Sequence, residues 1–147
     1  MTPTDLLALI QSDPQASQLF ASGNDTDCAV RCGVIAPPVR QPVSADKVQE
    51  TASLNGLWGK LKIAALDSTM SDPPRGAAIA FIDWVESGRS LNMDNPAVQQ
   101  MAATLISFSL ATAQQVADLS ALASVSQAFT AAEVGAARQE GLTNAAT

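Results

Sequence analysis

Four polar residues near the amino end, Asn24-Asp25-Thr26-Asp27, form the densest group of oxygen ligands in the chain. Closely spaced carboxylates suit a hard cation such as Ca²⁺, but an EF-hand loop also needs a central glycine and a closing glutamate. Neither residue stands at the required position here. Asp25 and Asp27 fit a simpler role in the first turn of a helix, where the helix dipole attracts acidic side chains. The sequence therefore predicts no metal site at this cluster.

Lysines and serines are the next residues that could carry chemistry. The segment GLWGK at residues 56–60 superficially matches a phosphate-binding loop, but its glycine spacing is wrong and no strand precedes it. The chain contains no histidine, so no imidazole is available to activate a serine nucleophile. A Ser–Lys dyad would have to use Lys60 or Lys62, and no pattern pairs either lysine with a particular serine. We therefore predict that the protein is not an enzyme and binds no cofactor.

The two cysteines, Cys28 and Cys32, stand four positions apart, which places them on one face of a helix. A structural zinc site would need two more cysteine or histidine ligands, and the sequence has none. Free cysteine behaves as a small hydrophobic residue and is among the residue types most often buried. We therefore expect two buried structural thiols, and the alternative is a strained disulfide within one helical turn.

The chain is acidic, with a net charge of −6 over 147 residues and a pI near 4.3. Its eight basic residues are scattered rather than gathered into a stripe, which argues against binding to nucleic acid or to an anionic membrane. No apolar run reaches the roughly 18 residues of a membrane span, and the amino-terminal stretch lacks the basic start of an export signal. We therefore expect a protein made in a cytoplasm, with no membrane span and no nucleic-acid partner.

Short helices account for most of the chain. Capping residues recur along it, each followed by an alanine-rich stretch that often has proline or an acid in the first turn. These signals predict an all-α fold, a compact bundle of about eight short helices. We expect a single domain over residues 1–140 and a flexible tail over residues 141–147. The predicted helix starts lie at Thr2, Asp13, Asn24, Ser44, Asp72, Asn95, Thr112 and Thr130, with a further helix after Asn55-Gly56.

One stretch breaks the helical pattern. Residues 34–43 read VIAPPVRQPV, and their three prolines remove backbone donors and favour extended geometry, so the helix before them should end at Gly33. The stretch forms an edge strand at most. Such a strip loses little entropy on docking and is the leading candidate contact element, although it could instead fold over its own domain. Its candidate interface residues are Val34, Ile35, Pro37, Pro38, Val39, Arg40 and Pro42.

Aromatic side chains make up only 4% of the residues, so each one has a large share in the packing. Trp58 and Phe129 are further candidate interface residues, because aromatic side chains are frequent hot spots of binding. For Trp58 and Trp84 a position in the core is favoured over one in an interface, because burying such a ring contributes several kcal/mol. The aromatic residues expected to anchor the core are Phe20, Trp58, Phe81, Trp84, Phe108 and Phe129.

Several short motifs occur in a characteristic order. They are Leu6-Leu7-x-x-Ile10-x-x-Asp13-Pro14, Gly23-Asn24-Asp25, the Ser44-capped helix, Gly56-Leu57-Trp58, the run Leu122–Ala128, and Glu133-Val134-Gly135. In this order the chain resembles a group of small, mostly uncharacterised proteins encoded in the tail module of double-stranded DNA tailed bacteriophages. The chain departs from that group where Gln127 replaces an arginine and where extra residues separate Ala128 from Glu133.

The resemblance implies a structural protein of the virion that is synthesised in the cytoplasm of a host bacterium. It implies a tail-associated adaptor, such as a tail-tip, fibre-attachment or connector component, with other phage structural proteins as partners. Such proteins act in several copies around a symmetry axis, so a homo-oligomer or another symmetric multi-copy assembly is expected. The alternatives are a capsid decoration protein, or a cytoplasmic assembly chaperone or regulatory binder that is absent from the particle.

Overall fold

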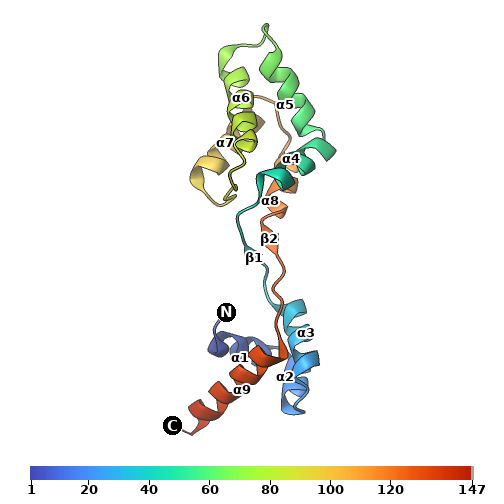
Figure 1. Ribbon diagram of the computed structural model, residues 1–147, viewed down its shortest axis with the longest axis vertical. Coiled ribbons are helices and arrows are strands. Elements are labelled where there is room, and N and C mark those ends of the chain that lie inside the picture. The colour runs from blue at the N-terminus through green and yellow to red at the C-terminus, as the bar shows by residue number, and fades with distance from the viewer. Residues whose placement is uncertain (147) are drawn as a thin grey trace. The chain divides into compact units, whose positions relative to one another are not determined.

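The computed structural model describes residues 1–146 and is predominantly helical, which confirms the all-α prediction (Figure 1). Nine helices occur in this part of the chain, where about eight were expected. The helices are α1 (Pro3–Ser12), α2 (Pro14–Ala21), α3 (Asp25–Ile35), α4 (Ala45–Leu54), α5 (Leu57–Leu66), α6 (Asp72–Glu86), α7 (Pro96–Ser107), α8 (Ala113–Ala121) and α9 (Ala131–Ala145). Two short strands, β1 (Val39–Arg40) and β2 (Ser124–Val125), pair with each other.

Most of the predicted helix starts are correct because they depend on local hydrogen bonds. Thr2, Thr112 and Thr130 each form a capping box, in which the threonine and the residue three positions later bond to each other's backbone N–H. The start of α6 differs by one residue, since Ser71 is its N-cap and Asp72 is already helical. Asp72 keeps its expected place at the positive end of the helix dipole.

The chain divides into two compact units, which differs from the single domain expected over residues 1–140. Unit 1 contains α1, α2, α3 and α9, so it is built from both ends of the chain. Unit 2 is the continuous segment Arg40–Val125, which contains α4 to α8. The physical reason is that the buried side chains form two separate clusters, one in each unit.

The core of unit 1 is small and is formed by residues from α1, α2, α3 and α9. Ile10, Cys28, Cys32 and Val134 are fully buried within it. Phe20 packs at its edge, with the Arg138 guanidinium 4.1 Å from the centre of the ring. This stacking contact buries the stem of an arginine as well as an aromatic face.

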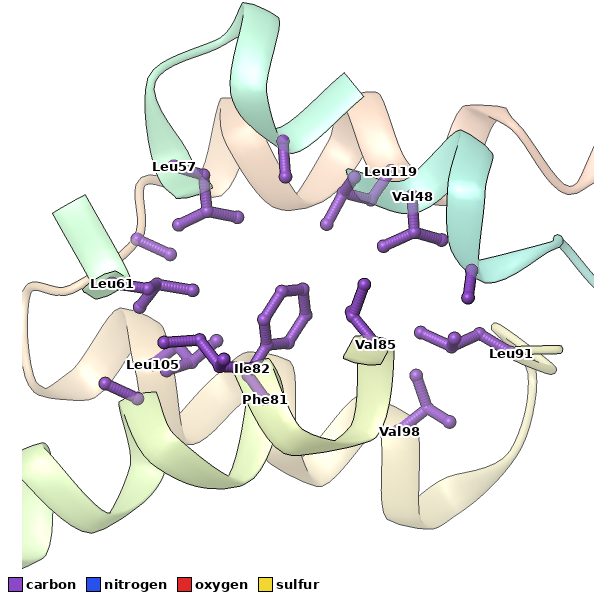
Figure 2. Close-up of a cluster of buried hydrophobic side chains, with 14 of the residues drawn as sticks. Val48, Leu57, Leu61, Phe81, Ile82, Val85, Leu91, Val98, Leu105 and Leu119 are labelled. Carbon is purple, nitrogen blue, oxygen red and sulfur yellow. The ribbon is translucent and has the colours of Figure 1, made fainter. Parts of the chain in front are cut away.

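The core of unit 2 is larger and draws on all five of its helices (Figure 2). Phe81 and Val85 point from α6 toward Leu119 and Val48 on other helices. Phe81 is buried as predicted, whereas Phe108 is about two-fifths exposed and does not anchor the core. The complete set of labelled side chains is Val48, Leu57, Leu61, Phe81, Ile82, Val85, Leu91, Val98, Leu105 and Leu119.

The proline-rich connector is shorter than predicted. Gly33, Val34 and Ile35 belong to α3, and extended backbone begins at Ala36. The helix persists because the first proline is Pro37, and a following proline disfavours helical geometry only at the residue directly before it. Beyond the prolines, Val43 is buried and forms an antiparallel bridge with Leu91, so this end of the predicted connector is part of unit 2.

The flexible tail predicted for residues 141–147 is helical for most of its length. Helix α9 continues to Ala145, and Ala146 is its C-cap. Gly141 lies against Leu7, whose Cδ2 would be 3.4 Å from a β-carbon at the glycine, so the two helices pack closely there. Thr147 lies outside the described residues. Within residues 1–146, no helix combines the length and the apolar character that crossing a bilayer requires.

Candidate interaction surfaces

A groove of about 320 Å³ opens in unit 2, where residues of α6, α7 and α8 line its walls. Its walls are mainly apolar, and the flexible side chains of Met93 and Met101 are among them. The aromatic residues Phe81 and Trp84 contribute from α6. A cavity of this size accommodates a small apolar ligand or a few side chains of a partner protein.

The polar rim of this groove is organised by Arg40. Its guanidinium donates from Nη2 to Asp94 at 3.0 Å, and from Nη1 to the Ser120 carbonyl at 2.9 Å and to Ser124 Oγ at 3.0 Å. Arg40 was expected to be an interface residue of the connector. Its donors are instead used inside unit 2, where they join β1 to the groove wall.

The remaining connector residues are divided between exposed and packed positions. Pro37, Pro38 and Pro42 are exposed, and Val39 is 36% exposed within the short sheet. The carbonyl of Pro37 accepts a hydrogen bond from Gln127 Nε2 at 2.9 Å, which fastens this part of the connector to unit 1. The predicted contact strip is therefore a partly anchored segment with exposed proline rings.

Four of the nine predicted interface residues lie on helices or pack on a core. Val34 is exposed on α3, while Ile35 is half-buried against the core of unit 1. Phe129 is half-buried against the same core. Trp58 is half-buried against the core of unit 2, so its ring is neither a free hot spot nor a central core residue.

Large aliphatic side chains that are well exposed form a second kind of surface, and only Val34 among them was a predicted interface residue. A hydrophobic side chain that stays in water leaves its burial free energy unused until a partner covers it. A signal was present, since the apolar residues of α5 do not keep to one face of that helix. The side chains that are 66% to 83% exposed are Val30, Val34, Leu54, Ile63 and Leu66.

The lysines considered for a dyad have other partners. Lys60 Nζ donates to the backbone carbonyl of Ser109 at 2.7 Å. Lys62 forms an ion pair with Glu86, and its Nζ lies 5.1 Å from the centre of the Trp58 ring. Each lysine therefore holds α5 to a neighbouring part of unit 2.

The carboxylate cluster at the start of α3 works as a helix cap. Asn24 accepts from the backbone N–H of Asp27 at 3.2 Å, which makes it the N-cap. Asp25 pairs with Arg138 of α9, so its charge joins two helices of unit 1. Throughout residues 1–146, no group of three or more Cys, Asp or Glu side chains is placed to hold a metal ion.

Both cysteine thiols are free and buried, which confirms the expectation of structural thiols. Burial raises the pKa of the Cys32 thiol to about 11, and it raises the pKa of Cys28 as well. A thiol with a raised pKa holds its proton, so the reactive thiolate is scarce at neutral pH. Cys28 and Cys32 therefore serve as packing residues of unit 1.

Comparisons with models of protein families, with curated proteins and with solved structures found no match to this chain. Functional inference for the protein therefore depends on its surfaces and on its sequence motifs. Two mainly apolar surfaces are the groove of unit 2 and the exposed aliphatic side chains on helices of both units.

Proposed function

We propose that this protein is a non-enzymatic structural protein of a bacteriophage particle and acts through contacts with other proteins. Within the particle it is a tail-associated adaptor, at the tail tip, at a fibre attachment or at a connector. The single observation that carries the contact function is the set of exposed aliphatic side chains on helices of both units, namely Val30, Val34, Leu54, Ile63 and Leu66.

The energetics of these side chains favour a partner. Burying one valine, leucine or isoleucine completely contributes about 1.5–3 kcal/mol. Single exposed hydrophobic residues are common on protein surfaces, but here Val30 and Val34 are one turn apart on α3, and Ile63 and Leu66 are one turn apart on α5. Each pair forms a short apolar strip that a neighbouring subunit can cover.

The low charge of the chain supports the same proposal. Charged residues make up 15% of the sequence, compared with about a quarter in an average soluble protein. The centres of protein interfaces are also poor in charged residues. The assignment to a phage tail draws on the motif resemblance, and the net charge of −6 favours protein partners over nucleic acid.

The proposal is tested by counting copies of this chain in purified particles with quantitative mass spectrometry. A tail or connector component is expected at a small symmetric number, on the order of three to twelve copies per particle. Hundreds of copies would instead make it a capsid decoration protein. Complete absence from particles would overturn the structural role and favour a cytoplasmic assembly chaperone or regulatory binder.

A further inference from the structure

Helix α5 of unit 2 is apolar on two opposite sides. Leu57 and Leu61 are fully buried on its inner side, facing the core. Each residue of a helix turns it by about 100°, so Ile63 lies about 200° from Leu61, on the opposite side. We define the outer face of α5 as Gly59, Ile63 and Leu66, which are spaced four and three residues apart. An amphipathic helix normally carries polar residues opposite its buried stripe, so large apolar side chains on that side indicate a contact surface.

Gly59 gives this face a shape suited to another helix. Apart from its chain neighbours and the backbone of its own helix, no atom lies within 4 Å of the position that a β-carbon would take at Gly59, so packing within unit 2 does not require a glycine there. Glycine is a poor helix former compared with alanine. A glycine one turn before Ile63 leaves a notch through which the backbone of a second helix can approach α5.

The charges that α5 itself carries are positive, whereas the acids nearest to it are Glu86, which pairs with Lys62, and Asp67, which caps the end of the helix. Helix α5 contains Lys60 and Lys62 and no acidic residue, in a chain whose net charge is −6. By the helical spacing, the two lysines lie on opposite sides of the apolar strip. Lys60 bonds to the carbonyl of Ser109 rather than to a carboxylate, so its charge remains available to an acidic group of a partner.

Lys62 can also serve a partner, although it is already paired. Its partner within unit 2 is Glu86, and both side chains are about half exposed. An ion pair between exposed groups has little net strength, because water screens the attraction. A carboxylate of a docked protein can therefore share or replace Glu86 at small cost.

We propose that the outer face of α5 docks an amphipathic helix of a different protein, whose apolar strip is flanked by aspartate or glutamate. This partner assignment deepens the proposed function and rests on it. The apolar strip of the partner would lie across Ile63 and Leu66, with its backbone close to Gly59. Its carboxylates would meet Lys60 and Lys62.

A second copy of the same chain is a poorer occupant of this face. In a two-fold symmetric contact, the same patch of each subunit faces its copy. Two α5 helices in such a contact would bring lysines toward lysines, and like charges placed together at an interface oppose binding. The charge pattern therefore favours a partner with the opposite sign.

Photo-crosslinking in cells that produce the particles tests this proposal. Leu66 is replaced by the photoreactive residue p-benzoylphenylalanine in the full chain, and crosslinked peptides are identified by mass spectrometry. We expect one predominant product, joined to a helical segment of another protein in which acidic residues flank an apolar strip. The same replacement at Ala80, which is exposed on α6, should give far less of this product.

Three substitutions in the crosslinking chain test the chemistry of the contact. Ile63→Ser should lower the yield at least about tenfold, because it removes the apolar contact. Lys60→Glu should lower it by a similar factor, because it places a negative charge opposite the carboxylates of the partner. Leu142→Ser is the matched control, since Leu142 is 62% exposed on α9, and it should leave the yield unchanged. Circular dichroism melts confirm that each variant is folded.

Several results would overturn the proposal. A product joined to a second copy of this chain would do so, as would one joined to a basic segment. The proposal would also be overturned by an equal crosslink yield at Leu66 and Ala80, or by an unchanged yield with Ile63→Ser. A product with the expected acidic helix, from a chain that is absent from purified particles, would support the docking proposal and overturn the proposed virion role.

Discussion

At the scale of single residues, one ion pair of unit 1 joins two consecutive helices. Asp13 accepts two hydrogen bonds from Arg31, at 2.9 Å and 2.7 Å, and one from the backbone N–H of Ala16 at 2.8 Å. These bonds stabilise the charged carboxylate, first through Arg31 and then through the cap, and lower the pKa of Asp13 to about 2. One side chain thus starts α2 and fastens it to α3.

This arrangement predicts a loss of stability in acid. The unfolded pKa of an aspartate is about 3.9, so the contribution of Asp13 is complete above about pH 4 and is lost as the pH falls through about 2. Asp13→Asn keeps an oxygen for the cap but has no charge to titrate. We expect its urea unfolding midpoint to be lower at neutral pH and to depend less on pH in this range. Arg31→Gln should have the same effect, and an unchanged pH dependence in both variants would contradict this explanation.

The buried thiols predict low reactivity in the folded state. Because burial raises the pKa of Cys32 to about 11, its contribution to stability is complete below the unfolded thiol pKa and is lost as the pH rises toward 11. At pH 8 we expect both thiols to react with Ellman's reagent at least about tenfold more slowly in the native than in the unfolded protein. A Ser90→Cys variant, with its new thiol at an exposed loop position, provides the fast-reacting control. Equal rates in native and unfolded protein would contradict the burial of both thiols.

At the scale of helices, the two faces of α5 predict opposite costs of truncation. Leu61 is fully buried and Leu66 is 83% exposed, one turn and a half along the same helix. Leu61→Ala should lower the free energy of unfolding by about 2–5 kcal/mol, through lost burial and a residual cavity. Leu66→Ala should change it by less than about 0.5 kcal/mol in the isolated protein. Urea unfolding of the two variants measures the difference, and comparable losses would show that the outer face is covered.

Two glycines, Gly76 inside α6 and Gly88 just after it, predict effects of opposite sign. Gly76 lies inside the helix, and outside its chain neighbours and helix backbone no atom is within 4 Å of a β-carbon position, so Gly76→Ala should stabilise the protein by about 0.5–1 kcal/mol. Gly88 follows the helix with φ +73°, a left-handed geometry that costs a residue with a β-carbon about 1–2 kcal/mol. Gly88→Ala should therefore destabilise. Chemical unfolding of both variants provides the comparison, and effects of equal sign would rule this explanation out.

At the scale of the whole chain, the division into two units predicts that one can be excised. Unit 2 is the continuous segment Arg40–Val125 and has its own core. We expect this fragment to show helical circular dichroism and a single cooperative thermal transition. Residues 1–39 alone should not fold, because α9 supplies the fully buried Val134 and Ala137 to the core of unit 1. Adding a peptide that begins at Ser126 should restore helicity to residues 1–39, and a fragment Arg40–Val125 without a cooperative transition would contradict the division.

The scale of an interaction explains which predictions succeeded. Thr112 and Thr130 were identified as helix starts because a capping box involves four consecutive residues. Gly33 was wrongly taken as the end of α3, since glycine is common both at helix ends and inside packed helices. A β-carbon at position 33 would lie only 3.2 Å from the carbonyl oxygen of Gln127. The close approach of a residue distant in sequence therefore explains why this position is a glycine. Local patterns carry no information about such contacts.

The candidate surfaces show the same limit. The proline rings of the connector are exposed as expected, whereas Arg40 turned inward to Asp94 and Ser120, both of which are more than 50 residues away in the chain. The sequence shows that α5 is apolar on two sides, but it does not show which side is buried, so the exposure of Ile63 and Leu66 is decided by packing. Packing of α5 against α6 covers the side with Leu57 and Leu61 and leaves the opposite side exposed.

Local hydrogen bonding and helical periodicity follow directly from the order of the residues. They account for the all-α class, the helix caps and the shared face of Cys28 and Cys32. The division into two cores, the role of α9 beside α1 and the uncovered side of α5 depend instead on which apolar faces meet. Many pairings of short alanine-rich helices satisfy the same periodicity, and the complete set of side-chain contacts selects one of them.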